Sequence, residues 1–129
     1  MGNATREKEL TASQYKELVG LLEEKRNDLG AALRSRRSGA SADPRTGDEA
    51  DQASEDAGVA LETRLMDRDA KLLREVERAM KKVADEIYGY CEGTDEPIGY
   101  ARLKLRPWTR YSVIYKEELE REARRQGGE

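Results

Sequence analysis

The sequence of 129 residues contains no histidine, no phenylalanine and a single cysteine, Cys91. Without histidine, the chain cannot build a Ser-His-Asp or a Cys-His nucleophile arrangement. One cysteine excludes an intrachain disulfide and a four-ligand zinc site made from cysteine and histidine. No apolar run approaches the roughly 18 residues that a membrane-spanning helix requires. Residues 1–10 are polar and lack the apolar core of a secretory signal, so we expect a cytoplasmic protein that does not bind a membrane.

Large apolar side chains are also scarce. Charged residues make up 40% of the chain, hydrophobic residues 36% and aromatic residues 5%. This composition does not supply the core of a compact sphere, and it favours an elongated fold with thin apolar seams between charged faces. The 24 basic and 27 acidic residues nearly balance, with a formal net charge of −3. The balance argues against a basic clamp, so direct sequence-specific DNA binding is not expected.

Two long amphipathic patterns predict a mainly α fold. Thr11 is a suitable helix N-cap and Gln14 completes a capping box, after which one helix is predicted to continue to about Arg37. Its apolar stripe, interrupted by Lys25, consists of Tyr15, Leu18, Leu22, Leu29 and Ala32. A second helix is predicted over about 51–86. Its stripe consists of Val59, Met66, Leu73, Val76, Met80, Val83 and Ile87, widened by Leu61, Leu65 and Leu72.

The segment between these patterns contains Pro44 together with glycines and serines, a composition that breaks a helix. Neither helix can bury its stripe alone. Residues 11–87 are therefore predicted to form a long antiparallel helical-hairpin coiled coil with its tip at about 38–53, and residues 1–10 a disordered lead-in. We expect a monomer, and the alternative is a longer-range dimeric coiled coil.

Beyond the hairpin the composition changes, because five of the six tyrosines and the only tryptophan lie there. Residues 88–108 are predicted to form a small globular module, in which Ile98–Leu105 alternates in part like a strand. Residues 109–129 are predicted to form a C-terminal helix, over about 109–125, and a tail.

Several short motifs gather in the module. They are Tyr88–Glu92 (YGYCE), Pro97–Gly99 (PIG), Arg102–Leu103 (RL) and Arg106–Pro107 (RP). Together with the order of the parts from about residue 11, they resemble the DksA/TraR family of bacterial RNA polymerase regulators. In that family the pattern belongs to a four-cysteine zinc finger. Here Cys91 is the remaining ligand, while Thr94, Ser112 and Tyr115 stand at the other ligand positions.

The resemblance therefore implies a zinc-finger-like module that lacks zinc, as in the zinc-independent branch of the family. A structural zinc supplies on the order of 10 kcal/mol of folding energy in small fingers, so its loss requires a substitute. We expect a mini-core of apolar side chains in its place. Its members are Tyr88, Tyr90, Ile98, Tyr100, Trp108, Tyr111, Val113, Ile114 and Tyr115.

The sequence DEADQA at residues 48–53 lies at the start of the second helix. Two aspartates at a helix start fit an N-cap and the helix dipole. The same letters match the D-x-x-D-x-A fingertip of the family. The resemblance implies that Asp48 and Asp51 face the active site of RNA polymerase, with Ala53 as a small contact. A rod of about 40 Å would carry them through the secondary channel and modulate open-complex stability.

The resemblance assigns further roles to residues of the base and flank. Arg68 matches a polymerase contact of the family, and a solvated helix charge is the alternative. Leu72, Arg106 and Lys116 match the family's site for guanosine tetraphosphate (ppGpp). Glu75 departs from it, because the family has a lysine there and an acid repels a polyphosphate.

We therefore expect a regulator of transcription initiation that binds bacterial RNA polymerase and acts with ppGpp in the stringent response. It is expected to have no enzymatic activity and no resident cofactor or metal, since no general base accompanies the tip. Two alternatives remain: a Gre-like factor that stimulates transcript cleavage, and a coiled-coil adaptor unrelated to transcription.

Overall fold

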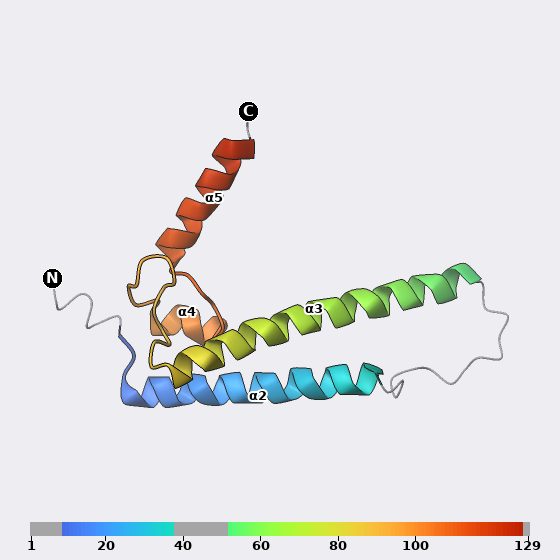
Figure 1. Ribbon diagram of the computed structural model, residues 1–129, viewed down its shortest axis with the longest axis horizontal. Helices are drawn as coiled ribbons and strands as arrows, with labels where there is room; N and C mark the ends of the chain where they lie inside the picture. Colours follow the sequence, from blue (N-terminus) through green and yellow to red (C-terminus); the bar gives the residue numbers. More distant parts are fainter. Residues whose placement is uncertain (1–8, 38–51, 128–129) are drawn as a thin grey trace.

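The computed structural model describes residues 9–37 and 52–127, and these ranges are mainly helical (Figure 1). The helices are α2 (Ala12–Arg37), α3 (Gln52–Ala84), α4 (Tyr100–Leu105) and α5 (Val113–Gly127). In Figure 1, α2 and α3 run side by side in opposite directions, α4 lies at their base and α5 projects away from it. The predicted helical hairpin, with a small module and a C-terminal helix, is confirmed.

Two predicted segments lie largely outside the described residues. The lead-in is described only from residue 9 and the tip only from residue 52, so both stay predictions. None of the helices in the described part combines the length and the hydropathy that a bilayer span requires.

The predicted capping box opens α2. The backbone N–H of Gln14 donates to Oγ1 of Thr11 at 3.1 Å, and the backbone N–H of Thr11 donates to Oε1 of Gln14 at 3.0 Å. Two of the orphan donors at the helix start are thus satisfied. Three arginines lie in the last turn of α2, where they complement the negative end of the helix dipole.

The core is a seam between α2 and α3 that continues into the module. On α2 it contains Leu18, Leu22, Leu29 and Leu33, which are buried. Val76 and Ala79 of α3, Tyr88 and Leu103 complete it. Lys25, the predicted interruption of the stripe, lies with its ammonium group 5.8 Å from the ring centroid of Trp108. The stem of Lys25 can therefore stay on the apolar side while its charge meets an aromatic face.

The distal part of α3 differs from the expected stripe. Val59 and Leu61 are 67% and 50% exposed. Arg36, in the last turn of α2, lies beside Glu62 of α3, so the residues of α3 before Glu62 extend past the end of α2 (Figure 1). The helical period alone does not reveal where the partner helix ends.

The end of α3 is closed by a Schellman arrangement. The backbone N–H of Ile87 donates to the carbonyl of Lys82 at 2.9 Å, and that of Glu86 donates to the carbonyl of Val83 at 3.1 Å. Glu86 has a φ of 63°, the left-handed conformation that this cap requires. The reversal directs the chain into Tyr88 and the module.

The predicted strand over Ile98–Leu105 is wrong. Tyr100–Leu105 forms α4, and within the described residues the extended pairing is limited to one bridge between Tyr90 and Pro97. Leu103 is buried in the core and Tyr100 packs against it, so a spacing of three residues puts both on the inner face of a helix. In six residues, alternation and helical spacing are hard to distinguish.

The expected mini-core is only partly present. Tyr88 is buried, and Ile98, Tyr100 and Trp108 pack against the core. Tyr90, Val113 and Ile114 are exposed, which corrects their predicted burial. The last two lie in the first turn of α5, which begins four residues later than expected and buries none of its residues.

Candidate functional site

The predicted tip is described only from the start of α3. Asp48 and Asp51, the predicted acidic tip residues, lie outside the described residues, so their placement stays a prediction. Ala53 is described and is exposed in the first turn of α3. Ala57 and Gly58 are also exposed one turn further along. These small residues alternate with the exposed acidic side chains of Glu55 and Asp56.

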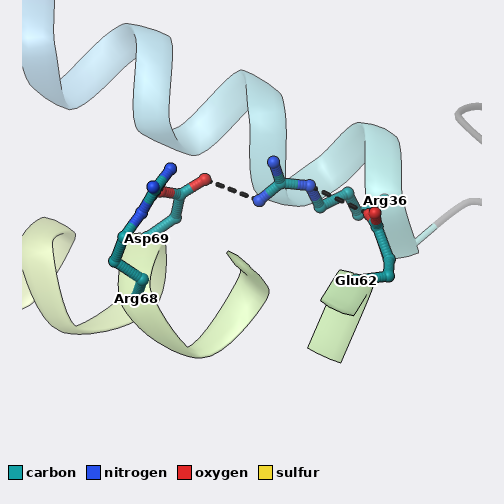
Figure 2. Close-up of polar contacts among 4 residues, drawn as sticks. All are labelled: Arg36, Glu62, Arg68 and Asp69. Atoms are coloured by element: carbon teal, nitrogen blue, oxygen red, sulfur yellow. Dashed lines mark hydrogen bonds and ion pairs between the residues drawn. The ribbon is translucent and has the colours of Figure 1, made fainter. Parts of the chain in front are cut away.

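A charged cluster joins the two helices near the end of α2 (Figure 2). Nη1 of Arg36 donates to Oδ2 of Asp69 at 2.5 Å. Nε and Nη2 of Arg68 donate to the other oxygen, Oδ1, at 3.3 and 3.2 Å. Nε of Arg36 also lies 3.0 Å from Oε1 of Glu62, although the two atoms do not have hydrogen-bond geometry. One carboxylate of α3 therefore binds an arginine from each helix.

Asp69 is buried, with 6% of its surface exposed, whereas the side chain of Arg68 is 68% exposed. Burial by itself raises the pKa of Asp69, but hydrogen bonds from Arg36 and Arg68 outweigh it and hold the pKa below its usual value. Asp69 is therefore ionised at neutral pH. Arg68, the predicted polymerase contact, has an exposed guanidinium group that is held by the buried carboxylate of Asp69.

A cavity of about 360 Å³ with mainly basic side chains lies beside α4 and the start of α5, in the part of the molecule formed by residues 88–116, which we call the base. Arg106 and Lys116, two of the predicted ppGpp residues, both line it, and so does Glu75. Leu72, the third predicted residue, packs against the core and does not line the cavity. The structure therefore brings together the two cations and places the acid of Glu75 beside them.

Arg102 and Arg110 line the same cavity, although no pattern in the sequence indicates this for either of them. Arg102 precedes Arg106 by about one helical turn, so the two side chains lie on the same side of α4. In the strand that the sequence predicted, this helical spacing has no meaning. Nε of Arg102 donates to the backbone carbonyl of Tyr111 at 2.9 Å, which connects α4 to the segment before α5. The cavity thus offers four cationic side chains against one carboxylate.

Glu92 fixes one of these cations. Its carboxylate accepts hydrogen bonds from Nε and Nη2 of Arg110 at 3.1 and 3.0 Å and lies 2.5 Å from Nζ of Lys82. Burial raises the pKa of Glu92, but the hydrogen bonds from Arg110 and Lys82 outweigh it and lower the pKa overall. The hydrogen bond to Glu92 in turn raises the pKa of Arg110. The wall of the cavity is therefore tied to the end of α3.

The four degenerate zinc-ligand positions come together in the module. Cys91 is buried with 1% of its surface exposed, and it interacts with the side chains of Thr94 and Ser112. Tyr115 covers the turn between them: a Cβ atom at Gly93 would lie only 2.2 Å from Cζ of Tyr115. The tyrosine ring therefore fills the space beside the turn.

The Cys91 thiol has an unusual environment. Burial raises its pKa, but hydrogen bonds from Thr94, Ser112 and Gly93 outweigh burial and lower the pKa of Cys91 to about 7. These hydrogen bonds replace the charge stabilisation that a metal would otherwise give a thiolate.

The residues at these positions do not fit a zinc ion. Structural zinc takes thiolate, imidazole or carboxylate ligands in a tetrahedron. Here one thiol is accompanied by two aliphatic hydroxyls and a phenol. Across the described residues no group of three or more cysteine, aspartate or glutamate side chains is placed to hold a metal.

The described fold is a long helical hairpin joined to a small finger-like module that contains one cysteine, Cys91, at the former ligand positions. The chain belongs to the DksA/TraR family. The family profile of the DnaK suppressor protein DksA, N-terminal domain, matches residues 14–83. That of the prokaryotic dksA/traR C4-type zinc finger matches residues 86–113. The predicted resemblance is confirmed.

Individual relatives agree with this assignment. The solved structure of transcription factor DksA2 from Pseudomonas aeruginosa is 34% identical, with a TM-score of 0.75 and 88% of each chain covered. The RNA polymerase-binding transcription factor DksA of Caulobacter vibrioides is 48% identical over 77 residues, which are 60% of this chain and 54% of that protein. The protein of the same name from Escherichia coli strain K12 is 43% identical over 60 residues, 46% of this chain and 40% of that protein. The chain thus matches about half the length of these curated relatives.

Proposed function

We propose that this protein is a transcription regulator that binds bacterial RNA polymerase and inserts its hairpin into the secondary channel. The observation that carries the proposal is the similarity to relatives named RNA polymerase-binding transcription factor DksA. The similar fold of transcription factor DksA2, over most of both chains, supports the same function for the whole arrangement of hairpin and base.

The dimensions of the hairpin support an insertion mechanism. At about 1.5 Å per residue, the 33 residues of α3 span about 50 Å and the 26 residues of α2 about 39 Å. The seam that holds α2 and α3 together is internal to the hairpin, so the rod can enter a channel without unfolding.

The tip acts by charge in this proposal. Asp48 and Asp51 would approach the active site and its magnesium ions, where carboxylates alter the local potential and the bound ion network. The protein is then a binding regulator of initiation and not an enzyme. Arg68 supplies a contact along the flank of the rod, to an acidic group of the polymerase.

The basic cavity supports a second part of the proposal, that ppGpp binds between the base and the polymerase. Arg106 and Lys116 line the cavity together, and Arg102 adds a planar donor group suited to phosphate. Glu75 opposes the binding of a polyanion. We therefore propose a ppGpp response that is weaker than a cavity with lysine at position 75 would give.

The test combines binding with transcription. Purified core RNA polymerase is mixed with the wild type, with Asp48→Asn plus Asp51→Asn, and with Glu55→Gln, a control acid in the first turn of α3. We expect all three to bind within about twofold of one another and the double variant alone to lose its effect on a ribosomal promoter. A wild-type protein that does not bind polymerase, or a double variant with full effect, contradicts the proposal.

A further inference from the structure

Arg68 is exposed on the flank of the hairpin, yet its guanidinium does not extend freely into solvent. Nε and Nη2 both donate to Oδ1 of the adjacent Asp69, at 3.3 and 3.2 Å. Figure 2 shows the Arg68 side chain folded back toward the Asp69 carboxylate. Neighbouring residues of a helix project about 100° apart, so this contact requires a specific side-chain conformation.

The position of Asp69 itself is fixed from the opposite helix. Its second oxygen, Oδ2, accepts a hydrogen bond from Nη1 of Arg36 at 2.5 Å, in the last turn of α2. Arg36 also lies beside Glu62, so its guanidinium is restrained on both sides (Figure 2). Burial of the carboxylate protects these contacts from screening by salt.

This arrangement has a consequence for recognition. A free arginine loses rotamer freedom when it binds a partner, whereas a side chain already ordered loses less. The contacts with Asp69 use Nε and Nη2, and among the described residues no contact of Nη1 with a carboxylate is found. Nη1 is therefore available to a carboxylate of a partner while Asp69 holds the other edge of the guanidinium.

We propose that Asp69, braced by Arg36, is a positioning residue that presents Arg68 to an acidic group of the partner. The inference rests on the proposed binding to RNA polymerase. It adds that recognition by Arg68 depends on a correctly closed hairpin, because the brace comes from α2 and the contact from α3. A hairpin that is out of register would lose the contact without any change in Arg68 itself.

The first experiment concerns the free protein and does not depend on polymerase. Nitrogen-15 relaxation and proton exchange of the Arg68 Nε–H are measured in the wild type, in Asp69→Asn and in the control Asp67→Asn. Asp67 is an exposed neighbour on the same helix. We expect slow exchange and restricted motion in the wild type and the control, and faster exchange in Asp69→Asn. Equal mobility of Arg68 in all three overturns the proposal.

The second experiment is a double-mutant cycle for binding to core RNA polymerase. We expect Arg68→Ala and Asp69→Asn each to weaken binding about tenfold, and the double variant to bind no more weakly than Arg68→Ala alone. Asp69→Glu is expected to recover part of the loss, because it keeps the carboxylate. If Asp69→Asn weakens binding equally with and without Arg68, its role is general stability and the proposal is overturned.

The two experiments separate the failure of this inference from that of the proposed function. An ordered Arg68 in a wild-type protein that does not bind polymerase removes the proposed function and, with it, the assigned partner. A mobile Arg68 in a protein that does bind polymerase removes only the positioning role of Asp69.

Discussion

The phenol of Tyr88 donates a hydrogen bond of 2.7 Å to the backbone carbonyl of Pro107, inside the core and 19 residues further along the chain. The rings of Tyr88 and Tyr15 of α2 also pack in a T-shaped pair, with their centroids 5.8 Å apart. Burial raises the pKa of Tyr88, so the phenol remains a donor at all physiological pH values. One side chain therefore connects the hairpin, the start of the module and the loop after α4.

We expect Tyr88→Phe to lower the free energy of unfolding by about 1–3 kcal/mol, because the Pro107 carbonyl is left buried without its donor. Thermal or urea unfolding followed by circular dichroism measures the change. Tyr90→Phe is the matched control: its phenol lies at the exposed surface, 3.3 Å from Glu9. The control should change stability by less than about 0.5 kcal/mol. Equal effects of the two substitutions would show that Tyr88 acts by its ring alone.

A methyl group at position 93 should disturb the module. A Cβ atom there would lie 2.2 Å from Cζ of Tyr115, so Gly93→Ala forces the ring to move, at a cost of about 1–3 kcal/mol. Gly58→Ala in α3 is the control, because its new Cβ meets no atom within 4 Å and alanine favours a helix by about 0.5–1 kcal/mol. The free energy of unfolding should therefore fall in Gly93→Ala and rise in Gly58→Ala. If the ring is the cause, Gly93→Ala should cost no further stability in a Tyr115→Ala background, and an unchanged cost there would contradict this explanation.

The Cys91 thiol should titrate near neutral pH. Its pKa of about 7 lies below the ordinary value of 9.0, because hydrogen bonds from Thr94 and Ser112 outweigh burial. We expect Thr94→Val and Ser112→Ala each to raise the pKa of Cys91 toward 9.0, as measured by the ultraviolet absorbance of the thiolate. An unchanged titration in the combined variant would rule out these hydroxyls as the cause.

The same pKa predicts how stability depends on pH. A thiol with a lower pKa in the folded state than in the unfolded state contributes stability that is complete above pH 9.0 and lost as the pH falls to about 7. The free energy of unfolding of the wild type should thus rise across this interval relative to that of Cys91→Ser. Parallel curves for the two proteins would contradict the assignment.

Substitutions in the basic cavity should alter the response to ppGpp. We expect Arg106→Ala and Lys116→Ala each to weaken ppGpp binding to the polymerase complex about tenfold, and Glu75→Lys to strengthen it several-fold, since each changes one charge beside the polyphosphate. Binding of labelled ppGpp to the complex measures these effects. Arg78→Ala, an exposed cation of α3 that does not line the cavity, serves as control. Identical affinities across the series would place ppGpp elsewhere.

The sequence predicts the long elements better than the short ones. The capping box of Thr11 and Gln14 is a local pattern, and it forms as expected. The six residues of α4 depend on contacts with α2, so their pattern alone did not distinguish a helix from a strand. Val59 and Leu61 share the helical period of the stripe but extend past α2, and no local signal records this.

The site shows the same division. Arg106 and Lys116 were found through the family motif and share a cavity. Arg102 and Arg110 were missed, because their proximity depends on α4 and on the path to α5. Arg36 and Asp69 were missed as well: 33 residues separate them, and each looks like an ordinary surface charge in its own helix. Long-range ion pairs leave no periodic trace in a sequence.

The projecting helix α5 buries none of its residues, so a label on its far end would not disturb the core. A fluorophore or photo-crosslinker attached at Arg124 would stand clear of the seam between α2 and α3, and it would leave the basic cavity and Arg68 unaltered. A probe at this position would report how the protein is oriented in the proposed complex with RNA polymerase, because α5 is joined directly to the module that carries the cavity.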